Sequence, residues 1–181
     1  MNPALEQHLA DTDRFTETVT AVDRADAWSS PSPCVGWDAA AVVDHVVDTQ
    51  RDFLAQRGID TGPRPTGGPA AVWDEHQALV RRVAADDDLV GATYDGYFGP
   101  TTLAETLRDF YGFDLLVHRW DLGRAAGLDV TWDDREADAV EQALDGFGDS
   151  LYMDGICRPA LAPPAGASRQ TRLLARTGRQ A

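Results

Sequence analysis

Apolar residues recur along the chain at the spacing of amphipathic helices, and the stretches between them carry helix-breaking residues. The first periodic stretch, residues 4–25, has its apolar side chains three or four positions apart for most of its length: Leu5, Leu9, Phe15, Val19 and Val22. Two prolines within residues 27–37 bar a regular helix there. Asp38 then stands where an N-cap belongs, and it predicts a helix running to about Arg57.

The second half of the chain repeats this alternation of periodic and irregular stretches. The glycine- and proline-rich segment 58–69 reads as a loop, and 89–100 as an irregular or hairpin-like link. Thr101 or Thr102 can cap the next helix, with Glu105 available for a capping box. Apolar periodicity predicts the remaining helices over 70–85, 101–126 and 133–152, and a short basic helix over 169–176.

Five candidate helices, no convincing strand pattern and no internal repeat predict an all-α protein. Four of the helices are expected to form a four-helix bundle, joined by the hairpin-like link and followed by the short C-terminal helix. At 181 residues the chain suits a single domain, 1–181, that is large enough to bury a full hydrophobic core.

Charge and composition exclude several classes of function. The formal net charge is −14, so nucleic acid is not an expected partner, because phosphate backbones attract clustered positive charge. No long apolar run suggests a signal peptide or a membrane span, and the cytoplasm is the expected location. Cys34 and Cys157 lie far apart and form no zinc ribbon; one bridge stays open, although two reduced thiols fit a cytoplasmic protein better.

The predicted helix 101–126 carries polar residues where its inward stripe should be apolar. The stripe runs through Leu103, Leu107, Phe110, Asp114, Val117, His118 and Asp121. Asp114 and His118 are one turn apart, within about 40° of each other around the helix, so both can reach one cation. Asp121 could then orient the imidazole of His118. The alternative is a plain Asp–His hydrogen bond inside a polar patch.

A third ligand would have to come from another helix, where three further histidines remain. His45 lies on the flank of the apolar stripe of helix 38–57, which suits a ligand at an open cleft and equally suits an ordinary surface histidine. His8 and His76 stand among polar neighbours and are expected to be exposed to solvent.

Three motifs resemble the DinB-like metalloprotein superfamily. The run Ser-Pro-Cys-Val-Gly-Trp at 32–37, with His-Val-Val at 45–47, resembles the family pattern TPCxGW…HLV. Residues 113–122 resemble its second pattern, DxxVHxWDLA. Residues 171–179 resemble the RLLAxxGR ending of an actinobacterial branch, akin to the N-terminal domain of mycothiol-dependent maleylpyruvate isomerase.

This resemblance implies a DinB/YfiT-like four-helix bundle with a divalent metal held by His45, Asp114 and His118. The isomerase has Glu at the position of Asp114, so the shorter side chain requires a closer backbone approach. Gly123 stands where the motif usually has Ala, which loosens the helix slightly. Neither departure removes a ligand atom.

Two imidazoles and one carboxylate leave coordination positions open, which is typical of catalytic rather than structural zinc. Zinc is the first expectation, while nickel, iron and manganese also suit these ligands. The resemblance implies a metal-dependent transferase or isomerase using a low-molecular-weight thiol such as mycothiol; a hydrolase also stays open. The alternative is a non-catalytic metal- or ligand-binding protein, since Asp44, Asp48 and Asp121 are general-base candidates by position only.

Other residues carry weaker expectations. Cys34 precedes a helix N-terminus and is a redox-active nucleophile or, as we favour, a small packed residue of a tight turn. Trp37 and Trp120 are expected in the core or as a pocket wall. The basic tail, Arg169, Arg172, Arg176 and Arg179, is expected to dock on its own bundle or on a partner subunit, with contact to an anionic substrate as the alternative. Expected partners are a small-molecule substrate and, left open, a second copy in a homodimer.

Overall fold

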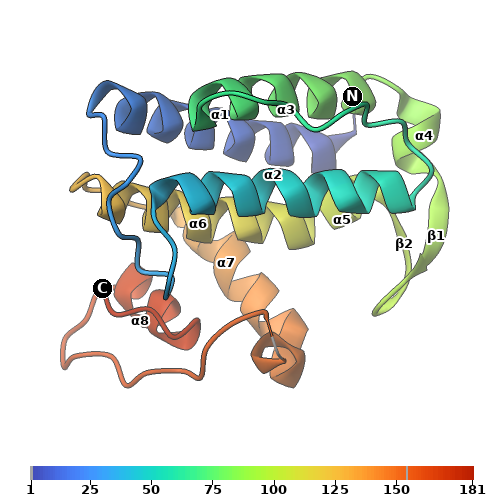
Figure 1. Ribbon diagram of the computed structural model, residues 1–181. Coiled ribbons are helices and arrows are strands. Elements are labelled where there is room, and N and C mark those ends of the chain that lie inside the picture. Colours follow the sequence, from blue (N-terminus) through green and yellow to red (C-terminus); the bar gives the residue numbers. More distant parts are fainter. Residues whose placement is uncertain (1, 154) are drawn as a thin grey trace. The chain divides into compact units, whose positions relative to one another are not determined.

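The computed structural model describes residues 2–153 and 155–181 (Figure 1). The chain is mainly helical, with one small two-stranded sheet, which confirms the all-α prediction. It divides into two compact units, Met1–Leu128 and Asp129–Ala181. The expectation of one domain over 1–181 stays a prediction. Among the described residues, no helix combines the length and apolar character needed to cross a membrane.

The first unit contains the predicted four-helix bundle. Its long helices are α1 (Pro3–Arg24), α2 (Ala39–Gln56), α3 (Pro69–Ala84) and α6 (Gly112–Ala125). Both α1 and α2 pack against α3 on one side and α6 on the other, so the four helices enclose a common core (Figure 1). Apolar residues from all four helices form the part of this core near the candidate site: Phe15, Val19, Val22, Val42, Val43, Val46, Val72, Trp73, Leu115 and Leu122. Burying each such Val or Leu side chain contributes about 1.5–3 kcal/mol.

The loop between α2 and α3, residues 57–68, folds back along α2, and we call it the strap. Arg64 of the strap binds the carboxylates of Asp44, in the first half of α2, and Asp48, at its middle. Arg51 of α2 donates to three strap carbonyls, those of Thr61, Gly62 and Pro63. The strap therefore returns the chain to the beginning of α2, and α3 runs in the same direction as α2 (Figure 1).

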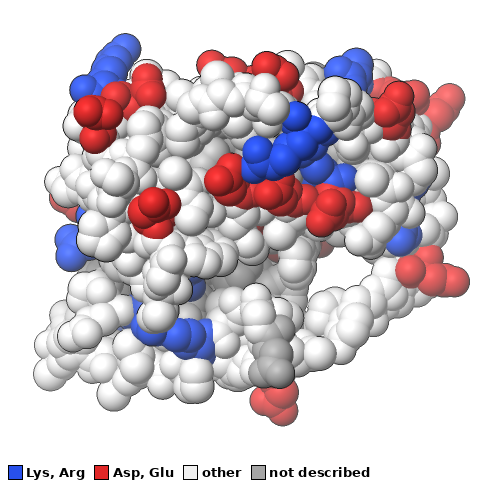
Figure 2. All heavy atoms as spheres, in the orientation of Figure 1, with Lys and Arg blue, Asp and Glu red and all other residues white. Residues whose placement is uncertain are grey.

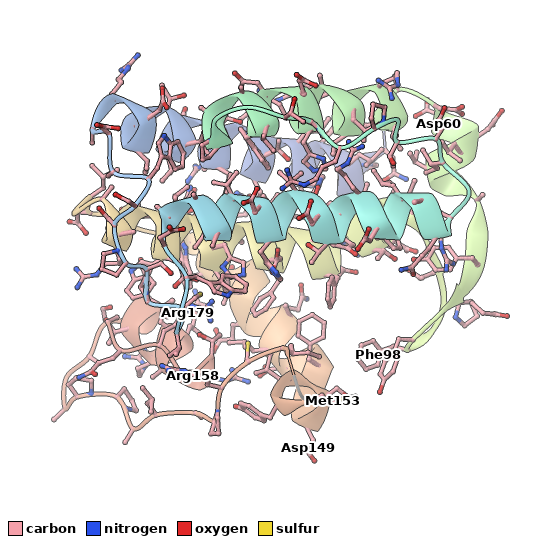
Figure 3. All side chains as sticks on the ribbon, viewed as in Figure 1. Asp60, Phe98, Asp149, Met153, Arg158 and Arg179 are labelled. Atoms are coloured by element: carbon pink, nitrogen blue, oxygen red, sulfur yellow. The ribbon has the colours of Figure 1, made fainter. Side chains whose placement is uncertain are left out.

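The link predicted as irregular or hairpin-like is a hairpin. After the short helix α4 (Asp87–Gly91), strand β1 (Thr93–Gly96) pairs antiparallel with β2 (Gly99–Thr102). The register places Gly96 opposite Gly99, which leaves Tyr97 and Phe98 as the two-residue tip. Figure 3 shows Phe98 at this tip, beyond the ends of both strands. The hairpin connects the end of α4 with the last helical segment of the bundle.

That last segment is one rod containing a π-helical turn. Thr102 and Glu105 form the predicted capping box at the start of α5 (Leu103–Thr106). A π-helix, η1 (Leu107–Tyr111), comes next, in which the amide of Gly112 donates to the carbonyl of Leu107, five residues earlier. The wider turn accommodates an extra residue and rotates the rest of the rod about its axis. Phe110, predicted to point inward, is therefore 42% exposed, and Tyr111 is buried instead.

The second unit contains α7 (Asp134–Phe147), the 3₁₀ helix η2 (Gly148–Tyr152) and α8 (Arg169–Arg176). Within this unit, ion pairs link the basic helix α8 to acidic residues of α7: Arg169 with Asp138 and Glu141, and Arg176 with Asp145. Arg158 donates to the carbonyl of Gly178, near the labelled Arg179 in Figure 3. Two of the four tail arginines are thus held by carboxylates of α7.

Candidate metal centre

Helix α2 presents His45 at its flank, as its apolar stripe predicted. The side chain of Asp38 caps the helix by accepting from the amide of Ala41. Val42, Val43 and Val46 turn inward and are fully buried, which leaves His45 beside the core rather than within it. Its side chain retains 27% exposure, so the imidazole is accessible from solvent.

Helix α6 contributes the other two predicted ligands. Its side chains from Gly112 to Gly123 are buried with the exception of Asp114, whose side chain is 19% exposed. His118 lies one turn further along, and its side chain is 9% exposed. Helix α6 packs directly against α2 (Figure 1). This pair therefore lies opposite His45, whose ring centroid is 4.9 Å from that of His118.

The three predicted side chains converge on one point. One ligand atom from each of His45, Asp114 and His118 lies within 4.8 Å of the others. Asp114 Oδ1 is 3.3 Å from Nε2 of His118 and 3.6 Å from Nε2 of His45. Two ligand atoms bound tetrahedrally to one zinc ion lie about 3.4 Å apart, whereas a separation of 3.6 Å is too long for a hydrogen bond.

The other oxygen of Asp114 provides a further test of whether a cation fits. Asp114 Oδ2 is buried and has no hydrogen-bond partner among the described residues. A buried carboxylate oxygen without a partner carries a large desolvation cost, which a neighbouring cation offsets. The donor set of two imidazoles and one carboxylate matches what divalent transition metals prefer. These residues therefore fit a divalent cation.

The opposite edge of the His118 ring makes ordinary hydrogen bonds. Nδ1 of His118 lies 2.9 Å from Oδ2 of Asp121, which is fully buried, and the thiol of Cys34 donates to the same oxygen over 3.3 Å. Cys34, His118 and Asp121 are also close enough together to be considered as metal ligands. Their separations match hydrogen bonds better, because 2.9 Å is shorter than two zinc ligands adopt.

Paired charges dominate the electrostatics of the cluster. Burial alone would raise the pKa of Asp114, but the imidazoles of His118 and His45 outweigh it and hold this pKa well below its usual range. Burial would lower the pKa of His118, yet the carboxylates of Asp114 and Asp121 raise it well above the ordinary value. Both shifts favour a charged pair with a proton held between Asp114 and His118, and a cation that bound here would displace this proton.

A pinned turn at residues 32–37 closes one side of the cluster. The hydroxyl of Ser32 accepts from the amide of Cys34 and donates to the carbonyl of Trp37, and Gly36 adopts a φ of 80°. The indole of Trp37 packs on the imidazole of His45, with ring centroids 4.8 Å apart, and lies 6.0 Å from that of His118. Trp37 is thus a wall of the cluster, one of the two roles expected for it.

The three general-base candidates named from sequence are all engaged. Asp44 and Asp48 bind Arg64 of the strap, and Asp121 accepts from Cys34 behind His118. Figure 2 shows basic and acidic side chains side by side over this part of the bundle. The role of Arg64 was not predicted, because no local sequence pattern indicates that a loop residue contacts Asp48, 16 positions earlier in the preceding helix.

The expectation that His8 and His76 face solvent is wrong. Both are fully buried inside the bundle. Nε2 of His76 lies 3.1 Å from Oε1 of Gln50. Burial lowers the pKa of His8 to about 4, against the opposing effect of the Leu107 carbonyl. Burial, aided by Arg51 and His8 and opposed by Asp48, lowers the pKa of His76 to about 3. Neither histidine joins the candidate metal site.

Comparison with known proteins identifies the family. Neither a curated protein nor a solved structure matches the chain significantly. A family model described as the mycothiol maleylpyruvate isomerase N-terminal domain matches residues 8–123. The matched region includes His45, Asp114 and His118, and it covers most of the four-helix bundle. The chain therefore belongs to the mycothiol maleylpyruvate isomerase N-terminal domain family, within the DinB-like superfamily.

Proposed function

We propose that this protein binds one divalent cation through His45, Asp114 and His118 and uses it in a thiol-dependent transferase or isomerase reaction. The observation that carries the proposal is the convergence of three ligand atoms from two helices within 4.8 Å. Zinc is the first candidate, and nickel, iron and manganese accept the same ligands. The family description supports mycothiol, or a thiol of similar kind, as the co-substrate.

A divalent cation bound here would supply Lewis acidity, which lowers the pKa of water or of a thiol held beside it. The residues of the chain have separate tasks. His45 and Asp114 form the more exposed edge, from which a small molecule can approach. Asp121 fixes the ring of His118 by accepting from Nδ1, so that Nε2 faces the point between Asp114 and His45 where a cation would bind. Trp37 packs against both imidazoles and limits the access of water from its side.

Metal content tests the binding part of the proposal. The purified wild type, His118→Ala and Asp109→Asn are loaded with Zn²⁺, desalted and measured by elemental analysis. We expect about one equivalent of zinc in the wild type and a near-complete loss in His118→Ala. Asp109, whose carboxylate is bound by the neighbouring Arg108, is an exposed acid outside the cluster, and its variant should retain the metal. Equal zinc in wild type and His118→Ala would overturn the proposed site.

Turnover tests the enzymatic part. The zinc-loaded wild type is assayed with mycothiol and with other low-molecular-weight thiols against a panel of electrophiles and isomerisable unsaturated acids. We expect thiol consumption or isomerisation that His118→Ala lacks. Absence of activity across the panel, with metal bound, would contradict the proposal that the protein is an enzyme.

One observation favours a second candidate function, a metal- or ligand-binding protein without catalysis. Asp44 and Asp48 are paired with Arg64, and Asp121 is buried behind His118, so each of the general-base candidates is already engaged by another side chain. A metal-loaded structure distinguishes the two functions. A fourth protein ligand closing the coordination sphere would support the non-catalytic protein, and an open position would support the enzyme.

A further inference from the structure

The turn at residues 32–37 connects the sequence just before α2 to the far edge of His118. Besides the bonds of Ser32, the amide of Trp37 donates to the carbonyl of Cys34, and Pro31 forms a bridge with Asp38. The turn is thus fixed at both ends, and its position is tied to the beginning of α2. It holds Cys34 in a half-buried position next to α6.

The thiol of Cys34 takes part in a hydrogen-bonded chain that leads to a candidate ligand. Its sulfur lies 3.3 Å from Oδ2 of Asp121, a normal distance for an S–H donor and a carboxylate acceptor. The same oxygen lies 2.9 Å from Nδ1 of His118. Because both donors meet at one oxygen, the thiol restricts how the carboxylate can rotate about its side-chain torsion.

We infer that Cys34 is a positioning residue that acts on His118 through Asp121. Its S–H donor holds Oδ2 of Asp121 against Nδ1 of His118, which fixes the plane of the imidazole and directs Nε2 toward Asp114 and His45. This inference deepens the proposed function, on which its consequence for metal binding rests. It assigns a donor role to Cys34, where the sequence suggested a redox-active nucleophile or a simple packing residue.

A donor role makes different predictions for two substitutions that remove the thiol. Serine retains a donor at the same position, although its O–H is shorter, whereas alanine removes the donor and leaves Asp121 with one fewer partner. A residue that only packs would tolerate alanine as well as serine, because both replace a small side chain. Cys157, the other free cysteine, is also half-buried but lies in the second unit. It provides a matched control.

The experiment measures the Zn²⁺ affinity of the full chain by competition with a chelator in the wild type, Cys34→Ala, Cys34→Ser and Cys157→Ala. Loss of a ligand-orienting partner costs about tenfold to a hundredfold in affinity, and a thiol is a weaker hydrogen-bond donor than most such partners, so we expect about a threefold to tenfold loss in Cys34→Ala. Cys34→Ser should stay within about twofold of the wild type, and so should Cys157→Ala. Equal affinity in all four proteins, or equal losses in Cys34→Ala and Cys34→Ser, would overturn the inference.

A second measurement separates this inference from the proposed metal site. Two-bond ¹H–¹⁵N spectra of the metal-free protein report which ring nitrogen of His118 carries hydrogen and how rigidly it is held. We expect a protected Nδ1–H signal in the wild type and Cys34→Ser, and faster exchange or a shift in Cys34→Ala. Unchanged His118 signals in Cys34→Ala would refute the positioning role. If the wild type binds no Zn²⁺, the proposed function fails, while this spectrum still decides the role of Cys34.

Discussion

The bundle contains two groups of buried histidine, and they differ in what surrounds the rings. His118 is nearly buried, but Asp114 and Asp121 face its two nitrogens and raise its pKa. His8 and His76 are fully buried; an amide oxygen of Gln50 faces His76, and their pKa values fall to about 4 and about 3. Burial disfavours the charged imidazolium and lowers the pKa in both groups. This effect is reversed only at His118, where carboxylates face the ring. The same residue type thus becomes a candidate ligand in one place and a neutral core residue in the other.

The largest expected effect comes from removing the carboxylate that distinguishes the two groups. Asp114→Asn should lower the Zn²⁺ affinity by more than about a hundredfold, because losing a ligand costs more than losing an outer partner. In the metal-free protein the pKa of His118 should fall, since Asp114 is the main cause of its elevation. Chelator competition and an NMR titration of the His118 ring measure the two effects. An unchanged pKa of His118 in Asp114→Asn would contradict the claim that facing carboxylates distinguish the two groups of histidine.

Acid should destabilise the protein through the second group. The pKa of His76 is lowered to about 3 in the folded state, against 6.5 in the unfolded chain. Between these two pH values the unfolded chain binds a proton at His76 and the folded chain does not. The free energy of unfolding is therefore unaffected by His76 above pH 6.5 and falls as the pH drops below this value, by about 2 kcal/mol at pH 5.

The measurement is urea unfolding at pH 8 and pH 5 with a chelator present, so that metal release does not contribute. Between these pH values the wild type should lose about 2 kcal/mol more than His76→Gln, which has no ionisable group at this position. Subtracting the two proteins cancels the contribution of His118, whose raised pKa acts in the opposite direction. The same pH dependence in both proteins would count against a neutral, buried His76.

The smallest effect is expected behind the candidate site. Asp121→Asn retains an oxygen acceptor for Nδ1 of His118 but removes the negative charge that makes the ring a better ligand. The Zn²⁺ affinity should fall by about tenfold, at the lower end of the range for partners of ligands. Isothermal titration with Zn²⁺ measures this change, with thermal unfolding as a check on the fold. An affinity loss as large as that of Asp114→Asn would mean that Asp121 itself binds the metal.

Local pattern was sufficient where neighbours along the chain decide the structure. Helix bounds followed from periodicity and caps, so that 38–57 was predicted and Ala39–Gln56 is observed. The capping box of Thr102 and Glu105 and the hairpin before it were also readable, because a few adjacent residues form them. Likewise, Asp114 and His118 had to share one face of a helix, whatever the rest of the chain does.

The sequence pattern gave wrong predictions for the burial of side chains that depends on more than the neighbouring residues of a regular helix. The polar neighbours of His8 and His76 along the chain suggested exposure, but the bundle encloses both rings. Phe110 was assigned to the inward stripe because a regular helix was assumed, and the π-helix η1 shifts the register by one residue. Packing between residues far apart in sequence buries the two histidines, and the wider turn closed by the bond from Gly112 to Leu107 changes the direction of Phe110.

The sequence by itself determined the helices, the spacing of Asp114 and His118 and, through its motifs, the family to which the chain belongs. The motifs also implied that His45 joins this pair, but only the tertiary structure brings its ring there, and it alone decided that Cys34 reaches Asp121 across 87 positions of the chain. The reason is physical. Helical periodicity is a property of neighbouring residues, whereas a cluster of ligands requires side chains that only the packing of α2 and the 32–37 turn against α6 brings within a few ångströms.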